Sequence, residues 1–262
     1  MTDAEIAARF DAAHDIARQA GELALGFFRH REALVIEGKG PQDMASNADH
    51  RVEALIRQRL EEWFPDDGFF GEEDGGRDGT SGGLWVVDPI DGTANFVNGI
   101  PVWCVSIAFL AGQSLEIGVI FDPNVGEMFT ARRGHGASLD GAPIRASRAA
   151  SFKDGTVGIG YSPRTEPAPA LQALDRLLAE GGMFQRNGSG ALMIAYVAAG
   201  RLIGYYEPHI NAWDCLAGIA LVVEAGGWAN DFLAGDGLAR GNPIAVSGPN
   251  LAADLRRIIG YS

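Results

Sequence analysis

Two aspartates, Asp88 and Asp91, follow a short apolar run and are the residues of this sequence best placed to do chemistry. The run 84–87 is predicted to be a buried strand. We expect Pro89 to end it, because proline has no N–H to give to the ladder of hydrogen bonds. A buried carboxylate is costly unless it is paired, hydrogen-bonded or bound to a metal. The turn after the strand is therefore predicted to hold metal ions and a phosphate.

Two further acids stand at predicted element boundaries, and together the four acids form an oxygen-only set. Glu72 lies near the end of a short strand at 69–73, and Asp214 lies at the start of an apolar helix at 213–225. Neither Cys nor His accompanies them at a zinc-binding spacing. Oxygen ligands suit Mg²⁺ or Mn²⁺, and two such ions can clamp a phosphate and activate a water. A helix opening after the second aspartate would offer its first N–H groups to the phosphate, those of Gly92, Thr93 and Ala94.

Some of these polar residues also have a purely structural explanation. Ser46 and Asp49 have the spacing of a helix N-cap and its capping-box acid. Asp214 at a helix start could serve only to complement the helix dipole. Lys39, in the Gly/Pro loop 37–41, has the character of a solvated surface residue. Local sequence alone leaves the roles of these residues open.

The elements around the acids fall into two parts with different rhythms. Residues 4–28 predict an amphipathic helix, since apolar residues recur every three or four positions. Residues 102–139 have the pattern of consecutive strands with short turns, which favours an antiparallel sheet. We therefore predict an α+β lobe over 1–150 that holds most metal ligands, and an α/β lobe over 151–262 that completes the site. Within the second lobe strands are predicted at 156–160, 202–207 and 244–247, and helices at 167–180, 189–199, 213–225 and 251–259.

Composition limits the class of protein. The chain has 262 residues, enough for one large domain or two intimate lobes. Its 21 Lys and Arg against 34 Asp and Glu give a net charge of −13, which disfavours nucleic-acid polymers and anionic membranes as partners but not small phosphorylated substrates. No apolar run is long enough to span a membrane, and the N-terminus lacks a secretory pattern. With only two cysteines, a cytoplasmic location is expected.

Motifs of several other enzyme classes are incomplete. The sequence has no Walker loop and no dinucleotide-binding fingerprint after a first strand. Residues 188–190 resemble the nucleophile elbow of a hydrolase only in part, because the glycine that should precede them is missing. The histidines show no triad pattern, although a triad is a spatial arrangement.

Four ordered segments carry a family resemblance. They are 85–93 (Trp-Val-Val-Asp-Pro-Ile-Asp-Gly-Thr), 213–214 (Trp-Asp) with 225–227 (Ala-Gly-Gly), 71–73 (Gly-Glu-Glu), and 43–49 ending in Ser-Asn-Ala-Asp. In this order and spacing they resemble the motifs of the inositol monophosphatase family over nearly the whole chain. The resemblance implies a layered α/β/α/β/α sandwich, a homodimer, and lithium-inhibited, magnesium-dependent hydrolysis of phosphate monoesters.

The resemblance also implies roles for individual residues. Thr93 and Asp49 would position and deprotonate the attacking water, and Glu72 would act in catalysis as well as in metal binding. Two or three Mg²⁺ ions would be bound, with Mn²⁺ as a substitute. The implied metal ligands are Glu72, Asp88, the carbonyl of Ile90, Asp91 and Asp214. The implied phosphate and substrate contacts are Lys39, Asp91, Gly92, Thr93, Ala94, Ser189, Gly190, Glu207 and Asp214.

The substrate is expected to be a small phosphorylated polyol, inositol 1-phosphate above all. Asn95 and Phe96 resemble the inositol monophosphatase branch of the family. The same chemistry on histidinol phosphate, fructose 1,6-bisphosphate or 3′-phosphoadenosine 5′-phosphate is the alternative within this class, since fold does not decide substrate. The alternative of another class is a non-catalytic regulatory or binding protein that keeps the fold.

Overall fold

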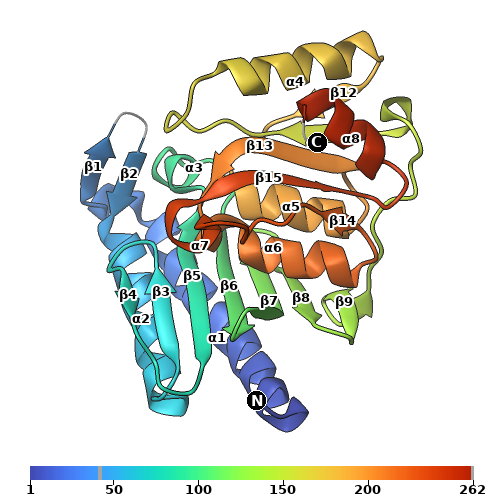
Figure 1. Cartoon of the computed structure of the whole chain (residues 1–262). Helices are drawn as coiled ribbons and strands as arrows, with labels where there is room; N and C mark the ends of the chain where they lie inside the picture. The colour runs from blue at the N-terminus through green and yellow to red at the C-terminus, as the bar shows by residue number, and fades with distance from the viewer. Residues whose placement is uncertain (41–42, 261–262) are drawn as a thin grey trace.

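A computed structural model of the protein describes residues 1–40 and 43–260, and it consists of five stacked layers (Figure 1). An eight-stranded and a five-stranded sheet lie on either side of a central helical layer, and a further pair of helices covers each outer face. This arrangement confirms the predicted α/β/α/β/α sandwich. From one outer face to the other the helix pairs are α1 (Asp3–Arg29) with α2 (Asn47–Trp63), α5 (Gly190–Ala198) with α6 (Ala212–Glu224), and α4 (Ala168–Ala179) with α8 (Ala252–Ile259).

The eight-stranded sheet is antiparallel except at one pair, β3 with β5. The antiparallel sheet predicted for residues 102–139 is therefore confirmed. The parallel pair matters for the site because it places the carboxyl ends of both strands side by side. In spatial order the strands are β10 (Ala142–Pro143), β9 (Gly136–Leu139), β8 (Glu127–Arg132), β7 (Ser114–Asp122), β6 (Cys104–Ala111), β5 (Gly83–Asp91), β3 (Gly68–Gly71) and β4 (Gly76–Arg77).

The five-stranded sheet comes from the second half of the chain, where the predicted alternation of strands and helices is confirmed. β12, β11 and β13 pair in parallel, whereas β15 pairs antiparallel with both of its neighbours, β13 and β14. In spatial order they are β12 (Met183–Gln185), β11 (Thr156–Ile159), β13 (Gly204–Ile210), β15 (Asn242–Ser247) and β14 (Trp228–Ala229). The fold also contains two short helices, α3 (Thr93–Val97) and α7 (Gly237–Arg240).

Three apolar cores hold the layers together. The small side chains on the buried stripe of α1, with Ile6 and Ile16, let this helix lie close against the eight-stranded sheet. The middle core packs α5 and α6 between the two sheets and contains residues from both sides of residue 150. The division into two lobes at that point stays a prediction. No helix within 1–40 and 43–260 is long and apolar enough to cross a membrane.

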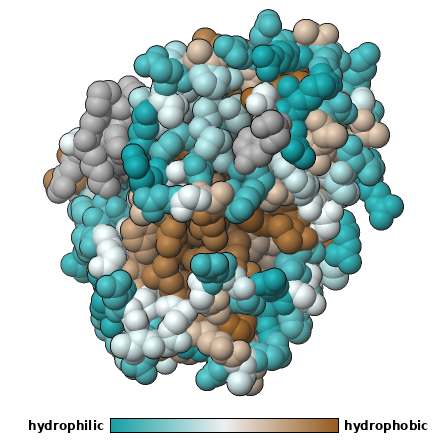
Figure 2. Space-filling model, viewed as in Figure 1, coloured by the Kyte–Doolittle hydropathy of each residue, from teal (hydrophilic) through white to brown (hydrophobic). Residues whose placement is uncertain are grey.

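The surface seen in Figure 2 is mostly hydrophilic, with hydrophobic residues gathered in the middle of the face, where α6 lies in Figure 1. Val223 of α6 is 52 % exposed. The rest of that helix turns its apolar residues into the core between the sheets.

Two sequence predictions about local structure were wrong. Pro89 does not end its strand: β5 continues to Asp91, and the strand accommodates the proline at a register shift between Asp88 and Asp91. A bulge leaves a residue unpaired, so the missing N–H costs no ladder bond there. The segment from residue 37 is not only a loop, because β1 (Ile36–Gly40) pairs with β2 (Asp43–Ser46). Residues 41–42, part of the predicted loop, lie outside the described residues.

We predict that Gly118→Ala lowers the free energy of unfolding by about 1–3 kcal/mol, the usual cost of overpacking a core. Gly118 lies in β7 under α6, and an added Cβ would stand 2.3 Å from the carbonyl oxygen of Ala217. Urea unfolding measures the change. The matched control is Gly26→Ala in α1, where an added Cβ meets no atom within 4 Å. Equal stability of Gly118→Ala and the unsubstituted protein would contradict this packing.

Candidate active site

Three carboxyl groups predicted as metal ligands meet at the carboxyl ends of two strands of the eight-stranded sheet. Oxygen atoms of Glu72, Asp88 and Asp214 all lie within 4.8 Å of one another. Glu72 directly follows β3 and Asp88 lies in β5, so the parallel pairing of these strands places both acids at the same end. The N–H of Glu72 continues the pairing by donating to the carbonyl of Val87 at 3.2 Å. Asp214 comes from the first turn of α6.

The helix that carries Asp214 also aims its carboxylate. One Asp214 oxygen accepts the backbone N–H of Asn211 at 3.0 Å and so closes the capping box of α6. Asp214 therefore stabilises the start of its helix, and it also lies in the acidic cluster. A capping acid uses few of its lone pairs on the backbone, which leaves the rest for another partner.

The electrostatics of the cluster fit a bound cation. Burial, together with the charges of Glu72, Asp91 and Asp214, raises the pKa of Asp88 well above its ordinary value. Burial also raises the pKa of Asp214, which shares a hydrogen bond with Asp88. Carboxyl groups this close must share protons or a cation. An all-oxygen donor set of this kind suits a hard divalent cation.

Asp91 has different partners from the other three acids. It accepts the hydroxyl of Ser189 and the N–H groups of Gly190 and Ala191, the latter two at 3.3 and 2.8 Å. These donors begin α5, so Asp91 ties the end of β5 to a helix of the second half. Burial and the charge of Asp214 raise the pKa of Asp91 to about 7, against the opposing effect of these hydrogen bonds. Its assignment as a metal ligand stays a prediction, as does that of the Ile90 carbonyl.

Thr93 and Asp49 lie together as the family resemblance implies. The Thr93 hydroxyl lies 3.2 Å from Asp49 Oδ1 and 3.0 Å from the carbonyl of Ile90, so either oxygen can accept its proton. The other Asp49 oxygen accepts the N–H and hydroxyl of Ser46 at 2.8 and 2.6 Å. The predicted capping box is thus confirmed, and burial raises the pKa of this acid. Asp49 both begins α2 and faces the threonine.

The turn between β5 and α3 depends on a glycine. Gly92 is the N-cap of α3 with φ +100°, and an added Cβ would lie 3.0 Å from the carbonyl oxygen of Val102. Only glycine adopts this conformation readily. The predicted helix start after the second aspartate is confirmed, and Gly92, Thr93 and Ala94 line the adjacent cavity.

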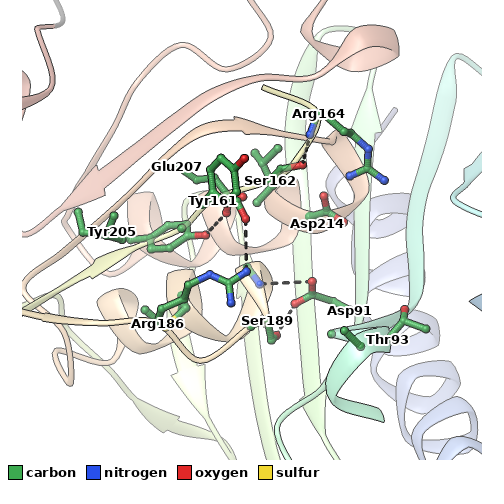
Figure 3. A pocket seen from close by; sticks show the side chains of 18 of the residues that line it. Asp91, Thr93, Tyr161, Ser162, Arg164, Arg186, Ser189, Tyr205, Glu207 and Asp214 are labelled. Carbon is green, nitrogen blue, oxygen red and sulfur yellow. Dashed lines mark hydrogen bonds between the residues drawn. The ribbon is translucent and has the colours of Figure 1, made fainter. Parts of the chain in front are cut away.

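A cavity of about 400 Å³ lies over these residues and between the two halves of the chain. Figure 3 shows Asp91, Thr93 and Asp214 on one side of it, with Ser189, Tyr205 and Glu207 reaching in from the second half. Ser189, Gly190 and Glu207, all predicted substrate contacts, are among its lining residues. Lys39 belongs to β1, but its side chain lies outside the described part of the structure.

Glu207 is a buried acid at the far side of this cavity. The Tyr205 hydroxyl donates to it, and burial raises its pKa to about 7. Arg186 lowers this pKa by its charge, though less than burial raises it. A carboxyl group poised in this way can donate to, or accept from, the hydroxyl groups of a polyol.

Five lining residues with polar side chains were missed by the sequence predictions. They come from the loop after β11 and from the segments around β12 and β13, where neither motif nor periodicity marks them. Arg186 donates to the carbonyl of Tyr161 at 3.3 Å, and the N–H of Arg164 donates to the Ser162 hydroxyl at 3.3 Å (Figure 3). The two arginines bring positive charge to a mostly acidic cavity. The missed residues are Tyr161, Ser162, Arg164, Arg186 and Tyr205.

We predict that Glu207→Gln reduces the pH dependence of stability in the metal-free protein. The folded protein binds the Glu207 proton more tightly than the unfolded chain does, because the pKa rises from 4.5 to about 7. This contribution to stability is present below the lower value and is lost as pH rises through the upper one. In a chelator, the gain in melting temperature from Glu207→Gln should therefore be larger at pH 8 than at pH 5. The exposed residue Glu166, changed to Gln, is the control; equal gains at both pH values would contradict the prediction.

Comparison with known proteins agrees with this geometry. A sequence profile described as the inositol monophosphatase family matches residues 7–258. The chain is 36 % identical over 257 residues to an inositol-1-monophosphatase of Rhizobium meliloti, covering 97 % of this chain and 94 % of that protein. It is 40 % identical over 222 residues to the Nus factor SuhB of Xylella fastidiosa, covering 84 % and 80 %. A crystal structure of the extragenic suppressor protein suhB from Bartonella henselae superposes with a TM-score of 0.90 at 34 % identity, covering 96 % and 98 %. The chain therefore belongs to the inositol monophosphatase family.

Proposed function

We propose that this protein hydrolyses a phosphate monoester of a small polyol, inositol 1-phosphate first among them, in a reaction that depends on Mg²⁺. One observation carries the proposal: Glu72 and Asp214 of the acidic cluster line the same cavity as Thr93, whose hydroxyl lies 3.2 Å from Asp49. A metal site alone would not need the second feature. A hydrolase needs both, because the attacking water must be bound and deprotonated.

The proposed ligands of two or three Mg²⁺ ions are the oxygen atoms already predicted. Mn²⁺ is the proposed substitute, since it accepts the same oxygen donors. When bound, such ions lower the pKa of a water and stabilise the charge on the leaving oxygen. The ligands are Glu72, Asp88, the carbonyl of Ile90, Asp91 and Asp214.

Thr93 and Asp49 are proposed to handle the proton of the attacking water. When the Thr93 hydroxyl donates to Asp49, 3.2 Å away, its own lone pairs remain to accept a proton from water. As the water oxygen forms the new bond to phosphorus, one water proton passes through the hydroxyl to the carboxylate. The ester bond breaks, and the alkoxide takes a proton from solvent. The N–H groups of Gly92, Thr93 and Ala94 are proposed to hold phosphate oxygens.

The second half of the chain is proposed to select the alcohol. Ser189, Gly190 and Glu207 line the same cavity as Glu72, Asp91 and Asp214. The volume of about 400 Å³ suits a small polyol phosphate. The relative named inositol-1-monophosphatase supports inositol phosphate as the first choice.

A non-catalytic function is the second candidate, because several relatives have a name that is not that of an enzyme. Proteins called Nus factor SuhB are up to 40 % identical to this chain, and that name describes a factor rather than a phosphatase. The non-catalytic alternative predicts a protein that keeps the fold but releases no phosphate. The paired Thr93 and Asp49 favour hydrolysis, because a binding protein has no need for them. A homodimer, lithium sensitivity, a cytoplasmic location and the absence of nucleic-acid partners stay predictions.

Released phosphate from a panel of esters with Mg²⁺ separates these functions. Inositol 1-phosphate should give the highest kcat/KM, above histidinol phosphate, fructose 1,6-bisphosphate and 3′-phosphoadenosine 5′-phosphate. Thr93→Ala should lower kcat by about 10²–10⁴-fold, the usual loss of an acid–base group. Thr80→Ala, at an exposed position, is the control. Normal turnover by Thr93→Ala would remove Thr93 from the reaction, and no hydrolysis of any ester would favour the non-catalytic function.

We also predict that Mg²⁺ raises the melting temperature. A ligand at 100 times its Kd stabilises the folded state by about 2.7 kcal/mol, or roughly 5–11 °C for a chain of this size. Asp88→Asn should abolish the rise, because it removes a proposed ligand. Asp122→Asn removes another buried acid, one outside the cluster, and should keep the rise. If millimolar Mg²⁺ leaves the melting temperature of the unsubstituted protein unchanged, this result would count against the metal site.

A further inference from the structure

Another buried acid near the site, Glu53, has no place in the proposed mechanism. It lies in α2, one turn after Asp49, and it is 0 % exposed. A buried carboxylate needs strong compensation, so its partners indicate what it does. The hydrogen-bond partners of Glu53 lie both in its own helix and in the segment that carries Glu72.

Glu53 binds the backbone directly after Glu72. Its two oxygens accept the N–H of Glu73 and the N–H of Asp74, each at 2.9 Å. Charged acceptors of this kind make the stronger hydrogen bonds in proteins. With the N–H of Glu72 already bound by the carbonyl of Val87, three successive N–H groups are held. The backbone that presents the Glu72 carboxylate is therefore fixed from both sides.

We call the bonds from Glu53 to the N–H groups of Glu73 and Asp74 the clamp. Two neighbouring residues complete it. Arg57, one turn further along α2, reaches the Glu53 carboxylate at 3.2 Å and the carbonyl of Gly75 at 3.3 Å. Gly71 leaves room for the carboxylate, because a Cβ there would stand 2.4 Å from Glu53 Oε2. The glycine is needed for this close approach, and not for an unusual backbone angle.

We propose that Glu53 is a positioning residue that sets the affinity of the site for its divalent cation by fixing the turn that bears Glu72. The proposal rests on the proposed function in assuming that the acidic cluster binds Mg²⁺. Partners that orient a metal ligand typically change affinity by 10–100-fold when they are lost. Since α2 also carries Asp49, the same helix holds both the proton acceptor and the turn of a metal ligand.

The chain supplies a matched control at the other end of the same strand. Asp67 directly precedes β3, as Glu72 directly follows it. Asp67 is also buried, at 2 % exposure, and accepts the forked guanidinium of Arg9 and the indole N–H of Trp85. Its loss should destabilise the fold without moving the Glu72 turn. A general effect of removing a buried, hydrogen-bonded acid can thus be separated from a specific effect on the cation.

The test is isothermal titration of Mg²⁺ into chelator-treated full-length protein. Glu53→Gln keeps one acceptor oxygen but sets an NH₂ group against one backbone N–H. We expect its Kd for Mg²⁺ to rise about 10–100-fold, while that of Asp67→Asn stays within about twofold of the unsubstituted protein despite a lower melting temperature. The Mg²⁺ concentration for half-maximal phosphate release should rise in parallel. At saturating Mg²⁺ the kcat of Glu53→Gln should return towards normal, because Glu53 touches neither the cavity nor Thr93.

An unchanged Kd for Glu53→Gln overturns the proposal, and so does an equal rise in Asp67→Asn. Should Glu53→Gln fail to fold, Arg57→Gln decides: a raised Kd supports the clamp and an unchanged one overturns it. If the unsubstituted protein neither binds Mg²⁺ nor releases phosphate, the proposed function falls, and this inference falls with it. If that protein does both and Glu53→Gln binds Mg²⁺ normally, only the inference fails.

Discussion

Repulsion between crowded carboxyl groups is the constraint on which the rest of the site depends. One oxygen each of half-buried Glu72, buried Asp88 and half-buried Asp214 lie within 4.8 Å of one another, and at such sites water screens like charges less than it does in bulk solvent. Burial raises the pKa of Asp88 and that of Asp214, so the folded chain resists holding both of these groups ionised. A fold can maintain such a cluster only if packing elsewhere is rigid enough to oppose it. The three apolar cores and the paired strand ends provide that rigidity.

The chain places its acids at points where the backbone itself needs an acceptor. Asp49 and Asp214 each close a capping box at the start of a helix, and Glu53 accepts N–H groups of a turn. A carboxylate that accepts such a backbone hydrogen bond is held in a single orientation, and its remaining lone pairs point in a defined direction. Structural and functional explanations of these residues are thus complementary.

The middle helical layer joins the two sheets into one site. The first turn of α5 donates to Asp91 at the end of β5, and the first turn of α6 brings Asp214 to the same edge. Of the residues that line the cavity, Asp91 and Thr93 come from the first half of the chain, whereas Ser189, Glu207 and Asp214 come from the second. Both halves therefore contribute to one site, and the fold by itself does not decide which substrate that site takes.

Short spacings in the sequence predict the buried strand before the two aspartates, the capping box of α2 and the start of α6 near Asp214, because hydrogen-bond geometry restricts such local patterns tightly. The layered fold was predicted from the family resemblance. Only the tertiary structure decided that β5 runs through Pro89, because a bulge in a sheet depends on the partner strand. It alone brought Ser189 to Asp91 across 98 positions, the arginines to the cavity, and Glu53 to the turn after Glu72. Such contacts arise from sheet pairing and layer packing, and no short-range pattern in the chain encodes them.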